Sequence, residues 1–89
     1  MKFEWDEAKA AANLAKHGIS FDEASEVFKA PHRISISDTR HDYGEERTNT
    51  TGMVNGILVL TVTHTDRQGV VCLISARPAS RRERNRYYE

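Results

Sequence analysis

The sequence has one cysteine, two prolines and no long apolar segment. A lone cysteine, Cys72, forms no disulfide within the chain, and no Cys/His spacing of the kind that binds zinc is present. Apolar runs such as 57–60 have the length of a strand, against the roughly 20 residues of a membrane span. Nothing near the N-terminus resembles a signal peptide. These absences argue against a secreted disulfide scaffold, a metal-binding module and a membrane protein, and favour a cytoplasmic domain without a cofactor.

Charge is balanced in number but not in place. The 89 residues include 13 basic and 13 acidic side chains, which argues against a surface that is cationic throughout. Residues 61–89, however, hold six arginines against three acidic residues, whereas all four lysines lie in the first third of the chain. Arginine binds phosphate or carboxylate through two points at once, so the C-terminal part is expected to meet such a partner. The alternative is a solvated helix face.

The first third of the chain reads as a helical hairpin. Asp6 is a good cap for a helix over 7–16 that ends at Gly18, and Ser20 opens a second helix that Pro31 stops. Residues 2–4 are compatible with a short strand before the first helix. At 89 residues and 38% hydrophobic types, the chain is expected to be one domain, 1–89, with a small core.

Beyond Pro31 the hydrophobic period changes from 3.6 to 2, and the C-terminal end returns to a helical pattern. A helix that Ser80 caps is expected to run through Tyr88. The predicted strands are 33–38, 45–54, 57–65 and 70–76, with a polar loop, Asp38–Gly44, after the first. The fold class is therefore α+β: a helical hairpin, a four-stranded antiparallel meander with helices on one face, and a C-terminal helix.

Strand register follows from the turns. Asn55-Gly56 is the strongest short hairpin signal, and as a two-residue loop it places Arg47 directly opposite His64. The next turn places Arg77 opposite Leu58, on the same face but six residues from His64. That separation is about 20 Å along the strands, at roughly 3.3 Å per residue.

The chemistry points to a phosphodiester. No phosphate-cradling glycine loop, nucleophile elbow or metal-binding carboxylate cluster is present, so nucleotide hydrolases and metalloenzymes lose their support. RNA cleavage needs no metal when the 2′-hydroxyl of the RNA attacks the phosphorus. We expect Arg77 and Arg47 to hold the phosphoryl oxygens and His64 to transfer protons. The alternative is that Arg47 and His64 are only a polar pair at a strand end.

Other basic side chains are candidates for contacts with an RNA backbone. They are Lys16, His17, Arg81 and Arg82. Each has a structural alternative, because cations at a helix C-terminus complement the helix dipole and arginines also solvate an exposed helix.

Several segments together resemble the BrnT toxin family. They are Phe3-Glu4-Trp5-Asp6, Asn13-x-x-Lys16-His17-Gly18-Ile19-Ser20-Phe21, Glu46-Arg47, His64-Thr65 and Ile74-Ser75-Ala76-Arg77-x-Ala79-x-x-x-Glu83-Arg84-x-x-Tyr87. The resemblance covers nearly the whole chain, and its second and last segments are the most specific. It implies a RelE-like fold and a ribonuclease toxin that arrests translation. It also implies that Arg77, then Arg47, then His64 are catalytic.

The resemblance further implies a partner. That partner is the antitoxin BrnA, whose ribbon-helix-helix domain binds operator DNA, so that the toxin meets DNA only through it. The expected function is thus a metal-independent endoribonuclease toxin that acts on RNA and is neutralised by such an antitoxin. A second interpretation is a non-catalytic protein-binding module that acts as co-repressor with a DNA-binding partner. The zero net charge favours the module, and the arginine bias favours the enzyme.

Overall fold

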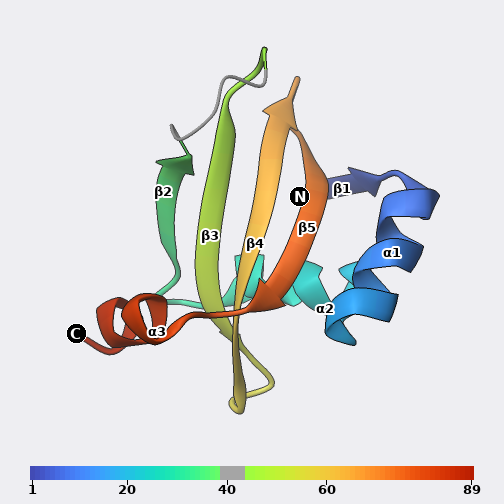
Figure 1. Cartoon of the computed structure of the whole chain (residues 1–89). Coiled ribbons are helices and arrows are strands. Elements are labelled where there is room, and N and C mark those ends of the chain that lie inside the picture. Colours follow the sequence, from blue (N-terminus) through green and yellow to red (C-terminus); the bar gives the residue numbers. More distant parts are fainter. Residues whose placement is uncertain (39–43) are drawn as a thin grey trace.

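The structure is a computed structural model that describes residues 1–38 and 44–89, so most of the expected loop Asp38–Gly44 lies outside the described residues. The elements are, in chain order, β1 (Lys2–Trp5), α1 (Glu7–His17), α2 (Phe21–Ser25), the 3₁₀ helix η1 (Glu26–Lys29), β2 (Ile34–Asp38), β3 (Arg47–Val54), β4 (Leu58–Arg67), β5 (Val70–Pro78) and α3 (Arg81–Tyr88) (Figure 1). Within these ranges no helix has both the length and the apolar character needed to cross a membrane.

The helical hairpin forms where its caps predict it. The Asp6 carboxylate accepts hydrogen bonds from the amides of Ala8 and Lys9, and α1 ends at Gly18 with φ +71°. The Ser20 hydroxyl accepts from the amide of Glu23 to start α2. The second helix tightens into η1 before the chain turns into the sheet.

The sheet differs from the expected four-stranded antiparallel meander. Its strands are ordered β1-β5-β4-β3-β2, and β1 pairs in parallel with β5, from Lys2 opposite Val70 to Trp5 opposite Leu73. The sheet is therefore five-stranded and mixed, and the RelE-like expectation with four antiparallel strands does not match it in detail. The short strand expected at residues 2–4 is present as β1, but nothing in its four residues indicates the partner strand, so the parallel pairing with β5 was not expected.

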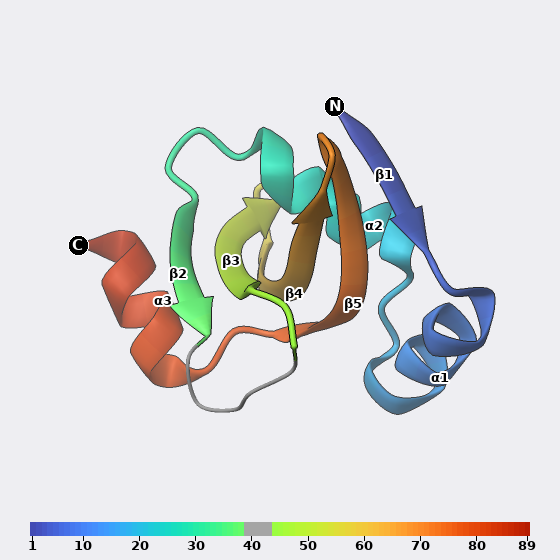
Figure 2. The ribbon, with the colours of Figure 1, turned by 90° about the horizontal axis from the view of Figure 1, so that it is seen from above.

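Helices lie on both faces of the sheet, which corrects the expectation that they share one. Figure 2 shows α2 on one side and α3 on the other. The core lies between the sheet and the α2–η1 side, and consists of Ile19, Phe21, Ala24, Val27, Phe28, Val54, Leu60, Val62, Leu73 and Ala76. Packing there is close, because a Cβ added to Gly52 would come within 3.0 Å of the Ala30 Cβ. We call the opposite side of the sheet, against which α3 packs, the open face.

The β3–β4 register differs by one residue from the prediction. Val54 is opposite Leu58, so the turn holds three residues, of which Asn55 and Gly56 have positive φ. Thr48, not Arg47, is therefore opposite His64. Side chains alternate between the faces along a strand, so this one-residue change places Arg47 and His64 on opposite faces of the sheet.

The β4–β5 register also differs. Gln68 and Gly69, both with positive φ, form a two-residue turn between Arg67 and Val70. A register shift at Thr63/His64 then offsets the two strands further. Arg77 consequently lies opposite Thr61 rather than Leu58.

Candidate active site

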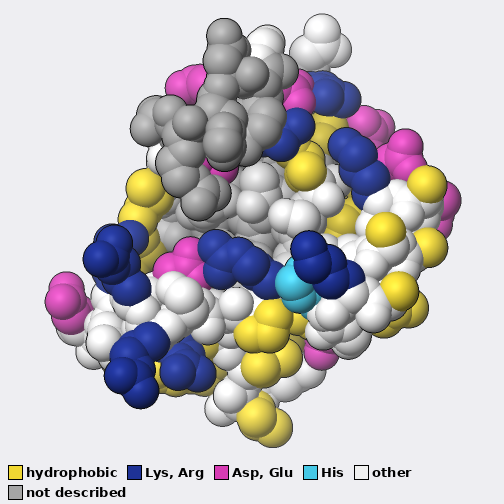
Figure 3. Space-filling model, in the orientation of Figure 1, with side chains coloured by type: hydrophobic (Ala, Val, Ile, Leu, Met, Phe, Trp, Pro, Cys, Tyr) yellow, Lys and Arg dark blue, Asp and Glu magenta, His cyan; other side chains and the backbone are white. Residues whose placement is uncertain are grey.

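The open face is lined by polar side chains in rows that cross the sheet. Arg77, Thr61 and Thr51 are opposite one another on β5, β4 and β3, and the two threonine hydroxyls are 2.8 Å apart. In the next row the Thr63 hydroxyl donates to the Asn49 amide oxygen at 2.6 Å. Figure 3 shows Lys and Arg side chains over α3 and in a row that runs from it toward the end of β5. A polar floor beside cations suits a charged ligand.

Arg77 and Glu83 form a two-point ion pair on this face, where β5 ends and α3 begins. Nη1 and Nη2 of Arg77 donate to the two Glu83 carboxylate oxygens at 2.6 and 2.9 Å. Glu83 also accepts from the amide of Ser80, so the same carboxylate caps α3 and ties it to β5. The two side chains are 38% and 19% exposed, so the pair is shielded yet reachable from solvent.

The electrostatics of Glu83 follow from these contacts. Hydrogen bonds from Arg77 lower the pKa of Glu83 to about 2, against the opposing effect of burial, with further help from Ser80 and Thr61. At neutral pH the carboxylate is ionised. Since the guanidinium is the largest cause of the lowered pKa, a ligand that draws Arg77 away would raise the pKa of Glu83 toward its usual value.

Helix α1, whose last turn holds Lys16 and His17, is tied to β5 through Asn13. Beyond the end of β1, the buried Asn13 side chain accepts from the amide of Ala76 at 2.9 Å and donates to the carbonyl of Ile19 at 3.0 Å. His17 is one helical turn after Asn13 on the same side of α1. Ala76 immediately precedes Arg77, so Asn13 ties the C-terminal half of α1 to the strand end that carries this arginine.

Arg47 shares the open face with Arg77 but stands apart from it. It lies four residues along β3 from Thr51, which is about 13 Å at the usual strand rise. Arg47 is half-buried, and its cross-strand neighbour on β2 is Asp38. A single phosphate does not span this distance, so the two arginines would act on the same RNA only at different phosphates.

His64 lies on the other face, and the expected Arg47–His64 pair is wrong. Its Nε2 is 2.8 Å from the Thr50 hydroxyl, and its ring packs edge-on against Phe28 at 4.8 Å. Nδ1 is buried without a hydrogen-bond partner in the described structure. Burial lowers the pKa of His64, against a smaller opposing effect of Asp66. The structure therefore does not bring His64 together with Arg77.

The remaining expected contacts, Arg81 and Arg82, are exposed in the first turn of α3. The sequence reasoning missed Glu83 and Thr61 as parts of the site. Glu83 stands three residues after the expected cap Ser80, where a glutamate is explained by a capping box alone, and only the register of β4 reveals that Thr61 faces Arg77. Among residues 1–38 and 44–89, no group of three or more His, Cys, Asp or Glu side chains is arranged to hold a metal ion.

Comparisons with known proteins bear on this site. The family described as "Ribonuclease toxin, BrnT, of type II toxin-antitoxin system" matches residues 5–83. The crystal structure of the Brucella abortus ribonuclease toxin BrnT superposes with a TM-score of 0.69 at 29% sequence identity, covering 91% of this chain and 99% of that one. A search of curated protein sequences finds no match. The family match includes Arg77 and Glu83.

Proposed function

Because this chain belongs to the BrnT family of ribonuclease toxins of type II toxin–antitoxin systems, we propose that it is an endoribonuclease that cleaves RNA without a metal at the Arg77–Glu83 pair. The observation that carries the proposal is this pair, a two-point arginine with a carboxylate on the face of the sheet where basic side chains gather. Arginine with two parallel donors matches the geometry of phosphoryl oxygens.

The proposed step is an exchange of partners followed by transesterification. The Arg77 guanidinium binds a phosphate of the RNA in place of Glu83, and the freed Glu83 carboxylate lies beside the reacting ribose. The 2′-hydroxyl oxygen bonds to phosphorus, its proton passes to the Glu83 carboxylate, and the bond from phosphorus to the 5′-oxygen breaks. Arg77 stabilises the charge that develops on the phosphoryl oxygens. We assign return of a proton to the leaving 5′-oxygen to His17, which lies in the last turn of α1.

The other basic residues receive supporting roles. Lys16, Arg81 and Arg82 bind phosphates to either side of the scissile one, and Arg47 binds RNA that continues across the open face. The sequence led us to expect that His64 transfers protons, but its ring packs against Phe28 on the opposite side of the sheet. The geometry therefore favours Glu83 and His17 for proton transfer.

Membership of a type II system implies an antitoxin and an RNA substrate. We propose that the antitoxin has a ribbon-helix-helix domain of the BrnA kind, that it alone contacts operator DNA, and that the toxin acts in the cytoplasm by arresting translation. The accessible site is consistent with neutralisation by a protein that covers it.

A second candidate function has one observation in its favour. The Arg77–Glu83 pair can also serve a purely structural role, because the same Glu83 carboxylate caps α3 and binds β5 and so holds the helix against the sheet. In that case the chain is a non-catalytic module that binds a DNA-binding partner as co-repressor.

Arg77→Ala separates the two candidates. Loss of a charge-assisted donor to the developing phosphoryl charge is expected to cost about 2–4 kcal/mol of barrier, a hundredfold or more in cleavage rate. Purified wild-type and variant chains are incubated with RNA in the presence of EDTA, and growth arrest is scored in cells. Arg67→Ala is the matched control, because Arg67 also pairs with a glutamate, Glu45, at the end of a strand.

The outcomes are distinct. We expect Arg67→Ala to cleave as the wild type does, and Arg77→Lys to fail almost as Arg77→Ala does, because lysine keeps the charge without the two-point geometry. An Arg77→Ala chain that melts far below the wild type supports the structural role. RNA that stays intact with the wild type contradicts the proposed activity.

A further inference from the structure

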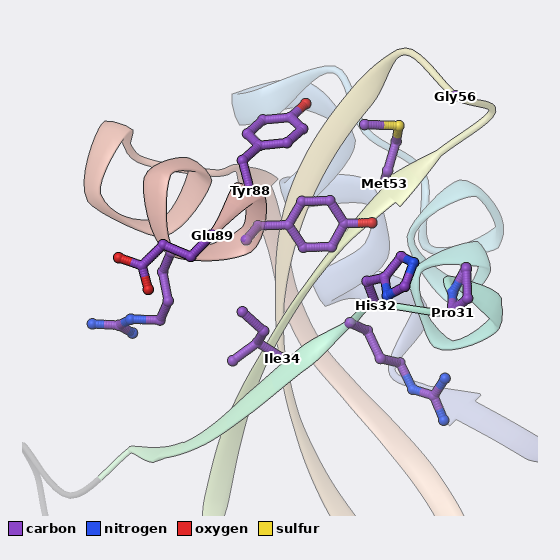
Figure 4. Close-up of a pocket in the computed structure, with 10 residues that line it drawn as sticks. Pro31, His32, Ile34, Met53, Gly56, Tyr88 and Glu89 are labelled. Atoms are coloured by element: carbon purple, nitrogen blue, oxygen red, sulfur yellow. The ribbon is translucent and has the colours of Figure 1, made fainter.

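A groove of about 780 Å³ lies between the C-terminal end of α3 and the segment that leads into β2 (Figure 4). Tyr88 and Glu89 border it on the α3 side, and His32, Ile34 and Met53 on the other, as Figure 4 shows. Tyr87, Arg86 and Arg33 also line the groove. None of these residues belongs to the catalytic assignment above.

We propose that this groove binds an unpaired base of the RNA substrate by stacking on Tyr88, with Arg33 and Arg86 on the adjoining phosphates. The proposal rests on the proposed function, because it takes RNA as the substrate. It adds a base-binding subsite at the far end of α3 from the scissile phosphate.

The aromatic pair supplies the stacking surface. Tyr87 and Tyr88 meet edge-to-face, with ring centroids 5.4 Å apart, and Tyr88 remains 63% exposed. An edge-to-face pair holds each ring in place while leaving a face of the outer ring available. Exposed aromatics beside cations are how single-stranded nucleic acids are bound without reading their sequence.

The charge of α3 decides between RNA and a protein as the occupant. From Arg77 to Glu89 the chain carries five arginines and two glutamates, and one of those glutamates, Glu83, is paired with Arg77. The groove itself has two arginines and Glu89. This excess of positive charge next to an open aromatic face fits a polyanion whose bases are unpaired.

The groove also connects to the proposed catalytic pair. Ile34 and Arg86 line both the groove and a smaller hollow of about 90 Å³ that Glu83 borders on the open face. Glu83 and Tyr88 are five residues apart on α3, about 7.5 Å along its axis. Because residues five apart also point about 140° apart around a helix, the RNA must cover more than this axial distance, that is, more than about two nucleotides at about 3.4 Å per stacked nucleotide. One strand can therefore reach both.

The test measures binding apart from cleavage. A short, fluorescein-labelled, single-stranded RNA with 2′-O-methyl riboses, which has no attacking hydroxyl, is titrated with wild-type and variant chains and followed by anisotropy. Tyr88→Leu keeps an apolar side chain but removes the ring, and we expect it to weaken binding about tenfold or more. Tyr88→Phe is expected to bind as the wild type does. Leu14→Ala, at an exposed apolar residue of α1, is the matched control and should have no effect.

Two further arms identify the source of any effect. Arg33→Gln and Arg86→Gln should each lower the slope of log Kd against log salt by about 0.7. The same Tyr88 variants are mixed with the antitoxin: if they lose antitoxin binding and keep RNA binding, the groove is a protein-docking site and the proposal is overturned. Wild-type affinity of Tyr88→Leu for the RNA overturns it as well. Intact RNA with a wild type that still binds through Tyr88 would remove the proposed activity and leave this subsite in place.

Discussion

At the scale of single residues, Glu83 shows how one carboxylate serves several neighbours. It caps α3, accepts both donors of Arg77 and lies close enough to Thr61 for this hydroxyl to help lower its pKa. Its folded-state pKa, about 2, lies below its usual value of 4.5. A lowered carboxyl pKa contributes stability that is complete above 4.5 and is lost as the pH falls toward 2.

Glu83→Gln tests this contribution. Glutamine keeps an oxygen for the Ser80 amide but loses the charge that pairs with Arg77, so we expect a loss of about 1–2 kcal/mol at pH 7, reduced by the partial exposure of the pair. Between pH 4.5 and 2 the wild type should lose stability that the variant never had, and their melting curves should converge. RNA cleavage should fall together with that of Arg77→Ala. Parallel melting curves across this range would contradict the assignment.

His64 is the residue whose expected role the structure changes most. Burial disfavours its charged form, so its pKa is lowered from the usual 6.5. The unfolded chain binds a proton that the folded chain resists, and stability should fall as the pH drops below about 6.5.

His64→Gln should remove this dependence on pH while keeping RNA cleavage within a few-fold of wild type, because the side chain is on the face away from Arg77. Chemical unfolding at pH 5 and pH 8, together with a cleavage assay, measures both effects. A hundredfold loss of cleavage without a loss of stability would return His64 to the active site.

Among the helices and strands, local sequence signals were sufficient to predict those features that depend on contacts between residues close together in the chain. The caps at Asp6, Ser20 and the Ser80–Glu83 box predict the starts of the helices, because each is a contact within a few residues. The register was not predictable in this way. Asn55-Gly56 is compatible with either a two-residue or a three-residue loop, and the choice depends on which side chains of β3 and β4 fill the core. The shift at Thr63/His64 leaves no local signal.

One buried side chain, Asn13, ties α1 to the sheet by hydrogen bonds, in addition to the packing of Ala10 against the core. Asn13 bonds the amide of Ala76 and the carbonyl of Ile19 at a buried position. Asn13→Ala leaves both groups without this partner, and we expect a loss of about 1–3 kcal/mol per unsatisfied group in the free energy of unfolding. Cleavage should also decrease, because His17 is positioned by the same contact. Asn13→Asp keeps the acceptor for Ala76 but sets a buried carboxylate against the carbonyl of Ile19, so we expect it to lose at least as much as Asn13→Ala at pH 7 and less at low pH, where the protonated acid can donate. A loss that does not change with pH would contradict this role of the side chain.

For the molecule as a whole, a net charge of zero conceals a separation of acidic and basic residues. The acidic residues gather toward the N-terminal part, and the arginines of β5 and α3 form a cationic region on the open face. The sequence indicated this asymmetry. The sequence did not predict that α3 packs on the face of the sheet away from α2. The Arg77–Glu83 ion pair shows this placement, and it depends on the direction in which the chain leaves the end of β5.

The division of charge predicts how RNA binding responds to salt. A neutral protein that binds through one region should show a modest slope of log Kd against log salt, set by the few phosphates that this region contacts. Arg81→Ala and Arg82→Ala should each reduce the slope by about 0.7 per lost phosphate contact, with little change in stability because both side chains are exposed. Lys29→Ala is the control, since Lys29 is exposed and pairs with Glu26 on the other side of the sheet. Titrations of an uncleavable RNA at several salt concentrations measure these slopes. If the lysine and arginine variants change the slope equally, the RNA is attracted by charges over the whole surface, and the proposal that it binds on the open face is contradicted.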